Sequence, residues 1–476
     1  MSYKTLIGLE IHVELNTNTK IFCGCSTEFG KEPNTQVCPV CLGLPGSLPI
    51  INEKVIEYGI KAGLALNCKI ANKVNMDRKN YFYQDLVKGF QTTQYYNPLC
   101  ENGYLNIENE GSNKKIRIKR IHIEEDTGKS IYDKERNILL DYNRCGVPLI
   151  EIVTEPDINS SKELSIFLEN LKQIIEYIEV SDCKMEEGSL RCDVNINIVD
   201  ENNNIKTEIV ELKNLNSFKN AIRAVEYEES RHIELLKYKK IGSKETRRWD
   251  ESENKTLAMR SKEDALDYRY FPEPDIVNVL LNEDMISDIE KSLPELPHDK
   301  KIRFIDKYEL SEYDVEILIA DKKIANFFEE TLNYTKEAKQ VANWITGDML
   351  RRLNDSKIKI DNIKFESKDL GELINYISNG DINNSTAKDI FRRMFEQGER
   401  PKVIIEDLGL KQINDDKELR LIVKEILSQN QDAVNEYKQG KDKVLGFLVG
   451  QIMKATKGKA NPKKINNILL EMVSKA

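Results

Sequence analysis

One strand pattern constrains the fold of this chain more than any other stretch. In residues 8–15, GLEIHVEL, apolar side chains alternate with Glu10, His12 and Glu14. Because successive strand side chains point to opposite faces, one face is apolar and the other carries two carboxylates and an imidazole. Side chains two apart lie roughly 6.5–7 Å apart, close enough to share a divalent ion or a phosphate. Taken alone, the pattern favours an ordinary half-buried strand.

The remaining sequence predicts an α+β chain in which strands come first and helices follow. Alternating or apolar runs predict strands at 5–15, 116–125, 149–154, 192–199 and 207–213. Helical spacing predicts helices at 53–66 and 161–179, the second with Ser160 or Ser161 as its N-cap. The segment SLPELP at 292–297 resembles a linker, and residues 298–476 have an almost wholly helical pattern with a break at 398–401.

Composition limits the partners of the chain. A net charge of −9 over 476 residues argues against non-specific nucleic-acid binding by the whole surface. Residues 438–464 nevertheless hold eight lysines and a single acid, Asp442, which fits either phosphate-backbone contact or a solvated face. No apolar run approaches the roughly 20 residues of a membrane span, and because the N-terminus enters a strand pattern at once we expect no signal peptide. We therefore expect a cytoplasmic protein without a membrane segment.

Four of the nine cysteines have the spacing of a metal site. Cys23 and Cys25 form one close pair, and Cys38 and Cys41 form a second pair after twelve intervening residues. Two short-spaced pairs separated by a loop favour a tetrahedral four-thiolate zinc site over chance positions. Because protein would fill all four ligand positions, the metal would be structural.

Several carboxylates interrupt apolar strand patterns. Glu151 and Glu211 are embedded in apolar runs, Asp193 follows Arg191 in alternation, and the segment IHIEED at 121–126 ends in three acids. Each acid alone fits a salt bridge or an edge strand, since a buried charge must be paired or metal-bound. Together with His12 on one sheet, they favour an oxygen-rich Mg²⁺ site for phosphate chemistry. Alternation leaves the choice between Glu124 and Glu125 open.

Nucleotide-binding loops of the common kinds are absent from the sequence. Gly128-Lys129-Ser130 resembles the end of a P-loop, but position 123 is Ile where that motif needs Gly. The segment RKNYFY at 78–83 places cations beside aromatic rings, a mixture that can stack on bases and neutralise phosphate. Such aromatic clusters are more often part of a core.

These segments resemble the B subunits of the bacterial aspartyl/glutamyl-tRNA(Asn/Gln) amidotransferases. The similarity covers essentially the whole chain in order and includes HIEED at 122–126, NRCGVPLIEIV at 143–153, KMEEGSLRCD at 184–193 and ELKNLNSF at 211–218. Further matching segments are residues 8–15, 77–83, 267–275, 446–454 and 460–462.

The resemblance implies an architecture and an activity. It implies a cradle-shaped catalytic domain at 1–293, with a mainly antiparallel sheet related to glutamine synthetase, then a helical domain at 294–400 and a tRNA-binding helical tail at 401–476. It also implies a heterotrimer with an amidase (A) subunit and a small (C) subunit. ATP would phosphorylate the side-chain carboxylate of Glu-tRNA(Gln) or Asp-tRNA(Asn), and ammonia from glutamine would then displace the phosphate.

The resemblance also assigns roles to residues. By the pattern of this family, His12, Glu125 and Glu151 hold Mg²⁺, with Glu125 favoured over Glu124. The expected catalytic and phosphate-binding residues further include Glu10, Asp193 and Glu211.

The resemblance also implies a role in ATP or tRNA binding for two more residues. Lys79 and Tyr81 would contact ATP phosphates or the tRNA acceptor end. The cysteine quartet occurs in only some members of the family, which fits a structural role for zinc.

Two alternative functions belong to different classes, one an enzyme subunit and the other a binding protein. The archaeal E-type subunit, which acts on Glu-tRNA alone, carries a large inserted domain after the catalytic part. Residues 275–294 are too few for that insertion. A non-catalytic, zinc-stabilised tRNA-binding protein would use the acids around His12 only as salt bridges.

Overall fold

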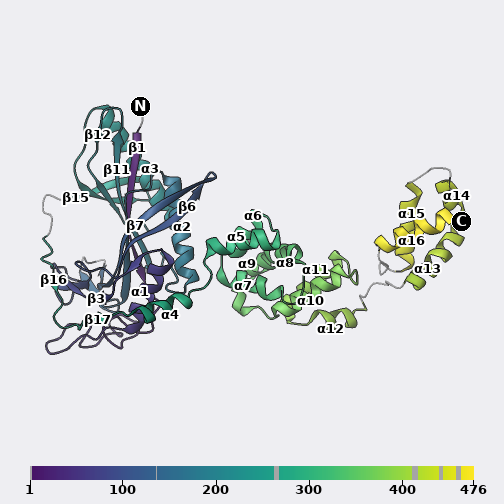
Figure 1. Cartoon of the computed structure of the whole chain (residues 1–476), viewed down its shortest axis with the longest axis horizontal. Coiled ribbons are helices and arrows are strands. Elements are labelled where there is room, and N and C mark those ends of the chain that lie inside the picture. The colour runs from purple at the N-terminus through teal and green to yellow at the C-terminus, as the bar shows by residue number, and fades with distance from the viewer. Residues whose placement is uncertain are drawn as a thin grey trace. The chain divides into compact units, whose positions relative to one another are not determined.

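The computed structural model describes residues 3–133, 135, 137–261, 267–409, 416–438, 443–456 and 462–475. The chain divides into two compact units, residues 1–297 and 298–476, and each is described by itself. The first unit holds the strands and the second is helical (Figure 1). The predicted α+β class is confirmed.

The first unit is built on one large sheet that is antiparallel except where β13 and β14 run parallel. Strand β1 (Tyr3–Glu14) lies near its centre, between β11 (Leu190–Asp200) and β10 (Pro148–Thr154). Beyond β10 come β7 (Ser112–Glu125), β6 (Cys100–Asn109) and β2 (Lys69–Ile70). Beyond β11 come β13 (Val210–Lys213), β14 (Glu245–Asp250) and β15 (Lys255–Ser261), and β12 (Ile205–Lys206) also pairs with β11.

The apolar face of this sheet packs against three helices, α1 (Glu53–Ala65), α2 (Ser161–Tyr177) and α3 (Phe218–Lys237). In β1 the alternation behaves as predicted, because Leu9, Ile11 and Val13 are buried while Glu10 and His12 are only partly buried. The side chain of Ser160 caps α2, as its position predicted. These three helices therefore cover the apolar face, and the polar side chains of the central strands lie on the opposite face of the sheet.

The predicted strands are confirmed within a few residues, with one shorter than expected. The segment 207–213 forms strand only at 210–213, and the Thr207 hydroxyl contacts Nδ1 of His232 in α3 at 2.7 Å.

Smaller strands and a short helix complete the first unit. Strand β4 (Asp77–Asn80) lies between β5 (Phe90–Thr93) and β16 (Phe271–Pro272), and β5 also contacts β7. Strands β3 (Lys73–Val74) and β17 (Val279–Leu280) pair, as do β8 (Lys129–Tyr132) and β9 (Ile138–Asp141). Residues 292–296 connect α4 (Glu283–Lys291) to α5 (Pro297–Tyr308), where the linker was expected.

The second unit contains two separate hydrophobic cores. The first is formed by residues 304–405, from α5 through α12 (Pro401–Asp407), and includes a π-helical turn at Trp344–Met349. Its other helices are α6 (Glu312–Ile319), α7 (Lys322–Thr331), α8 (Ala338–Asn343), α9 (Leu350–Ser356), α10 (Ser367–Ser378) and α11 (Asn384–Gln397). The second core joins α13 (Asp416–Gln429), α14 (Gln431–Lys438), α15 (Lys443–Ala455) and α16 (Pro462–Lys475).

Part of the lysine-rich tail lies outside the described residues, namely Lys441, Lys457 and Lys459. In the part of the chain that is described, no helix has both the length and the apolar character needed to cross a membrane.

Candidate functional site

Polar side chains from five neighbouring strands, β13, β11, β1, β10 and β7, lie along one face of the sheet. The register sets His12 of β1 opposite Glu151 of β10 on one side and Arg191 of β11 on the other. Glu151 in turn lies opposite His122 of β7. A second row sets Glu10 opposite Asp193. Antiparallel pairing thus brings together residues more than 100 positions apart in sequence.

Two histidines and two carboxylates form a tight cluster at this place. The Nε2 atom of His12 lies 3.2 Å from Glu124 and 3.7 Å from Glu151, and that of His122 lies 3.0 Å from Glu151 and 3.7 Å from Glu124. One ligand atom each from His12, Glu124 and Glu151 falls within 4.8 Å of the others, so the three could hold one metal ion. Carboxylate and imidazole ligands of this kind suit a divalent cation.

Burial strengthens the electrostatic interactions between the charged groups of this cluster. Burial alone would lower the pKa of His12, but the hydrogen bond to Glu124 and the charges of both carboxylates raise it to about 9. Burial also opposes ionisation of Glu124, yet hydrogen bonds from His12 and His122 hold the pKa of Glu124 well below its ordinary value. Two ionised carboxylates that lie side by side therefore need a positive charge between them, which protons or a metal ion can supply.

Glu125, which the resemblance favoured as the metal ligand, does not join this cluster. Its side chain forms an ion pair with Lys88 and accepts a hydrogen bond from the Thr92 amide at 2.7 Å. The physical reason is strand alternation, since Glu124 and His122 share one face of β7 while Glu125 points to the other, toward β5. In this structure Glu124, and not Glu125, lies with His12 and Glu151.

A second group of charges lies beside the first. Lys213 of β13 bridges Asp193 at 2.6 Å and Glu211 at 3.0 Å, and Asn195 donates to Glu10 at 3.1 Å. Burial, followed by the charges of Glu151 and Glu211, raises the pKa of Glu10. The predicted residues Glu10, Asp193 and Glu211 are thus brought together, with a lysine at their centre.

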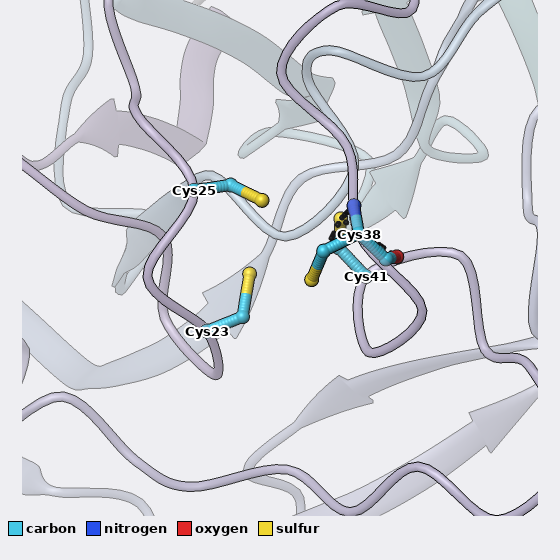
Figure 2. A group of neighbouring side chains, drawn as sticks. All are labelled: Cys23, Cys25, Cys38 and Cys41. Carbon is cyan, nitrogen blue, oxygen red and sulfur yellow. Dashed lines mark hydrogen bonds between the residues drawn. The ribbon is translucent and has the colours of Figure 1, made fainter.

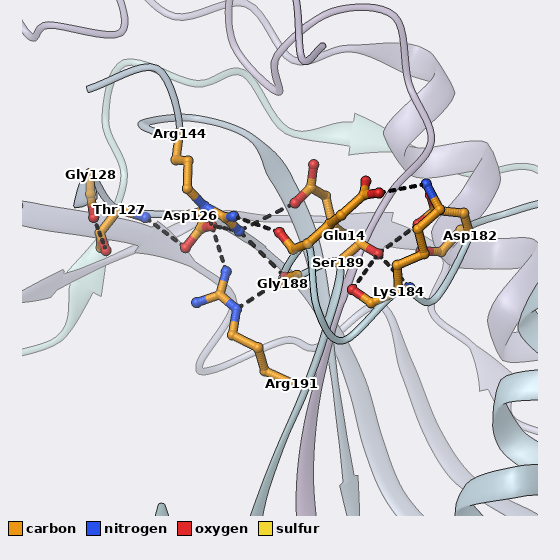
Figure 3. Close-up of polar contacts among 12 residues, drawn as sticks. Glu14, Asp126, Thr127, Gly128, Arg144, Asp182, Lys184, Gly188, Ser189 and Arg191 are labelled. Carbon is orange, nitrogen blue, oxygen red and sulfur yellow. Dashed lines mark hydrogen bonds and ion pairs between the residues drawn. The ribbon is translucent and has the colours of Figure 1, made fainter. Parts of the chain in front are cut away.

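A network built around Arg144, Asp126 and Arg191 lies where β7 ends (Figure 3). The buried carboxylate of Asp126, just past β7, accepts from Arg144 at 2.6 Å and from Arg191 at 2.5 Å. Arg144 also reaches Glu14 at 3.3 Å. This network ties the end of β7 to β1 and β11.

Lys79 and Tyr81 lie in an aromatic cluster at the β4 edge. The Lys79 ammonium lies 4.8 Å from the ring centre of Tyr268 and 5.8 Å from that of Tyr81. Tyr268 meets Tyr270 edge to face, and Tyr270 stacks on Tyr95 at 4.0 Å. Burial and nearby negative charges, among them that of Glu124, raise the pKa of Tyr81. The aromatic cluster therefore lies close to the acids of the sheet.

The four predicted cysteine ligands converge (Figure 2). Their Sγ atoms all lie within 4.8 Å of one another, and those of Cys38 and Cys41 are 3.9 Å apart. Zinc–sulfur bonds of about 2.3 Å in a tetrahedron require sulfur separations of roughly 3.8 Å. A hydrogen bond from the Cys23 thiol lowers the pKa of Cys41, which favours the thiolate form that binds metal. The donor set fits zinc.

Sequence reasoning missed His122, Lys213 and Lys88 as members of these groups. The run Ile121-His122-Ile123-Glu124 has the same alternation as β1, so it could have marked His122. The partners of Lys213 and Lys88 depend on strand pairing and carry no local signal.

Comparison with known proteins places the chain in a family. Residues 5–287 match the family model for the GatB/GatE catalytic domain, and residues 326–473 match the GatB domain. The chain belongs to this family. Relatives named as the B subunit of aspartyl/glutamyl-tRNA(Asn/Gln) amidotransferase match it from end to end. They include proteins from Caldicellulosiruptor bescii (52% identical over 479 residues, all of both chains) and Thermoanaerobacter sp. (53% over 475, all of both chains).

The GatB/GatE relationship identifies the chain as part of an amidotransferase. A further relative, from Finegoldia magna, is 51% identical over 473 residues, which are 99% of this chain and 100% of that protein. The catalytic-domain model covers both GatB and GatE, whereas the second model and these relatives are described as the B type alone. The comparison therefore favours the B type over the archaeal E type.

Proposed function

We propose that this chain activates misacylated tRNA for amidation. ATP phosphorylates the side-chain carboxylate of Glu-tRNA(Gln) or Asp-tRNA(Asn), with ADP as the leaving group. Ammonia then attacks the activated carbonyl carbon and phosphate leaves, which gives Gln-tRNA(Gln) or Asn-tRNA(Asn). The observation that carries the proposal is the convergence of His12, Glu124 and Glu151 on one sheet face, in a chain whose relatives are named for this reaction.

A carboxylate needs this activation because its oxygen is a poor leaving group. Phosphoryl transfer in turn demands charge neutralisation and positioning more than covalent help. A bound Mg²⁺ would supply positive charge to the phosphate oxygens. His12, Glu124 and Glu151 would hold the ion, and His122 would keep both carboxylates in place through its Nε2 contacts.

The second charge group would position the reacting phosphate. Lys213 can donate to a phosphate oxygen while Asp193 and Glu211 hold its ammonium in place. Glu10 completes this group. Lys79 and Tyr81 offer a cation beside aromatic rings, which suits either the ATP phosphates or the acceptor end of the tRNA.

The same family relationship supports our proposal for the wider assembly. We place the chain in a heterotrimer with an amidase (A) subunit that releases ammonia from glutamine and a small (C) subunit, in the cytoplasm. Residues 1–293 would be catalytic, 294–400 a helical domain and 401–476 the tail that holds the tRNA. Zinc on the four cysteines would stabilise the loop of residues 23–41 beside the catalytic sheet.

The experiment is Mg²⁺-ATP turnover by the assembled complex with Glu-tRNA(Gln), comparing Glu124→Gln with Glu125→Gln. We expect Glu124→Gln to reduce turnover at least ~100-fold while tRNA binding persists, and Glu125→Gln to leave the Mg²⁺ requirement unchanged. If only Glu125→Gln raised the Mg²⁺ requirement, Glu125 would be the ligand and the face assignment would be wrong.

A non-catalytic tRNA-binding role makes the opposite prediction. In that case, neither substitution would affect ATP turnover, because the acids would serve only as salt bridges. A loss of turnover in Glu124→Gln with unchanged tRNA affinity separates the two functions.

A further inference from the structure

Lys20 is a lysine without any exposed surface. It follows β1 and lies just before the first cysteine pair, and its relative exposure is 0%. Fully buried lysines are rare, because an ammonium loses its hydration unless a negative charge replaces it. The surroundings of Lys20 must therefore supply such a charge.

The contacts of its ammonium identify only one candidate for that charge. Its Nζ atom donates to Cys41 Sγ at 3.7 Å and to the Tyr142 carbonyl oxygen at 3.4 Å. Among the described residues, no carboxylate pairs with Lys20, and the nearby Glu125 is already paired with Lys88. The carbonyl is neutral, so the compensating charge is a thiolate of the cysteine site.

The cysteine site, in turn, needs a nearby positive charge once it binds zinc. Zn²⁺ bound to four thiolates carries two net negative charges, and this one is partly buried. Cys41 is the most buried of the four ligands, and it already accepts a hydrogen bond from the Cys38 amide at 3.1 Å. The Lys20 ammonium is the one formal positive charge that the described residues place in hydrogen-bond contact with these sulfurs.

We propose that Lys20 is the charge-compensating residue of the four-cysteine site and that its ammonium strengthens zinc binding through Cys41. The proposal rests on the zinc site proposed above. It makes Lys20 a positioning residue of the metal site, with no contact to the metal itself. Groups in this outer position typically change metal affinity by roughly 10- to 100-fold.

The test measures zinc affinity of the purified full-length chain by competition with a chromophoric chelator at pH 7, together with the midpoint of thermal unfolding with zinc and with excess chelator. The variant is Lys20→Met, which keeps an unbranched side chain only one atom shorter and removes the charge. The control is Lys31→Met in the loop between the cysteine pairs, where the lysine is half exposed and, among the residues that the structure describes, pairs only with Glu28 at 2.9 Å.

We expect Lys20→Met to weaken zinc binding about 10- to 100-fold and Lys31→Met to leave it unchanged. Without metal, Lys20→Met should be at least as stable as the wild type, because a buried ammonium has been removed. The gain in unfolding midpoint on adding zinc should therefore shrink in Lys20→Met alone.

Three results would overturn the proposal. Equal zinc affinity in Lys20→Met and wild type would show that the charge has no effect on the metal. An equal loss of stability with and without zinc, or an unfolded metal-free variant, would make Lys20 a packing residue only. If the wild type bound no zinc and gave no Co²⁺–thiolate absorption, the zinc site itself would be wrong, which is distinguishable from the first two results.

Discussion

The buried carboxylate of Glu228 allows a stability prediction with a worked magnitude. This residue of α3 has no exposed surface, and its partners are Arg231 at 2.7 Å, Arg247 at 3.1 Å and His232 at 3.3 Å. Burial alone would raise its pKa, but the hydrogen bonds from His232 and Arg231 outweigh burial and lower the pKa to about 2 from an ordinary 4.5. At about 1.4 kcal/mol for each pKa unit, the ionised form contributes about 3 kcal/mol to folding.

The sign of the pH dependence follows from that depressed pKa. The contribution is present in full above about pH 4.5, where the unfolded chain is also ionised, and it is lost as the pH falls through about 2. Glu228→Gln should therefore cost about 3 kcal/mol at pH 7, in line with breaking a buried ion pair. The difference from wild type should shrink toward zero near pH 2.

Tryptophan fluorescence can isolate this effect. The chain has two tryptophans, and Trp249 of β14 lies in the same sheet region as Arg247. In a Trp344→Phe background, urea unfolding followed by fluorescence reports on the first unit alone. The control is Glu234→Gln on the exposed side of α3, which should change stability by less than about 0.5 kcal/mol. A loss below about 1 kcal/mol in Glu228→Gln, or a loss independent of pH, would refute the reasoning.

Three further predictions concern the proposed catalytic face and the proposed metal sites. His122→Gln should raise the Mg²⁺ concentration needed for half-maximal ATP turnover about 10- to 100-fold, since it releases Glu151, and an unchanged requirement would contradict its positioning role. Asp126→Asn should cost about 3–5 kcal/mol in the same urea assay, because Arg144 and Arg191 lose a shared buried carboxylate, and a cost below about 1 kcal/mol would argue against it. Removing zinc with a chelator should lower the unfolding midpoint of the full chain reversibly, with recovery on adding Zn²⁺ but not Mg²⁺.

Local patterns predicted the parts of the fold that depend on neighbouring residues. The alternation in β1 placed His12 and Glu10 on one face because side-chain direction in a strand is fixed by sequence position. The spacing of Cys23, Cys25, Cys38 and Cys41 predicted their convergence because each pair is a short turn.

Features that depend on long-range pairing escaped sequence reasoning. The choice between Glu124 and Glu125 rests on which face of β7 looks toward His12 and Glu151, and the acids themselves are chemically alike. The burial of Lys20 has no local signal either, because its neighbours Thr19 and Ile21 fit an ordinary loop. Only the folded chain brings Cys41 to its ammonium.

The most direct test of the central claim follows the oxygen atoms of the substrate. Glu-tRNA(Gln) labelled with ¹⁸O in its side-chain carboxylate is converted by the assembled complex with ATP and glutamine, and the released phosphate is analysed by mass spectrometry. Phosphorylation of the carboxylate predicts one ¹⁸O atom in each phosphate, with labelled phosphate abolished by Glu124→Gln. Amidation that proceeds with unlabelled phosphate would contradict the account, because the carboxylate oxygen would never have bonded to phosphorus.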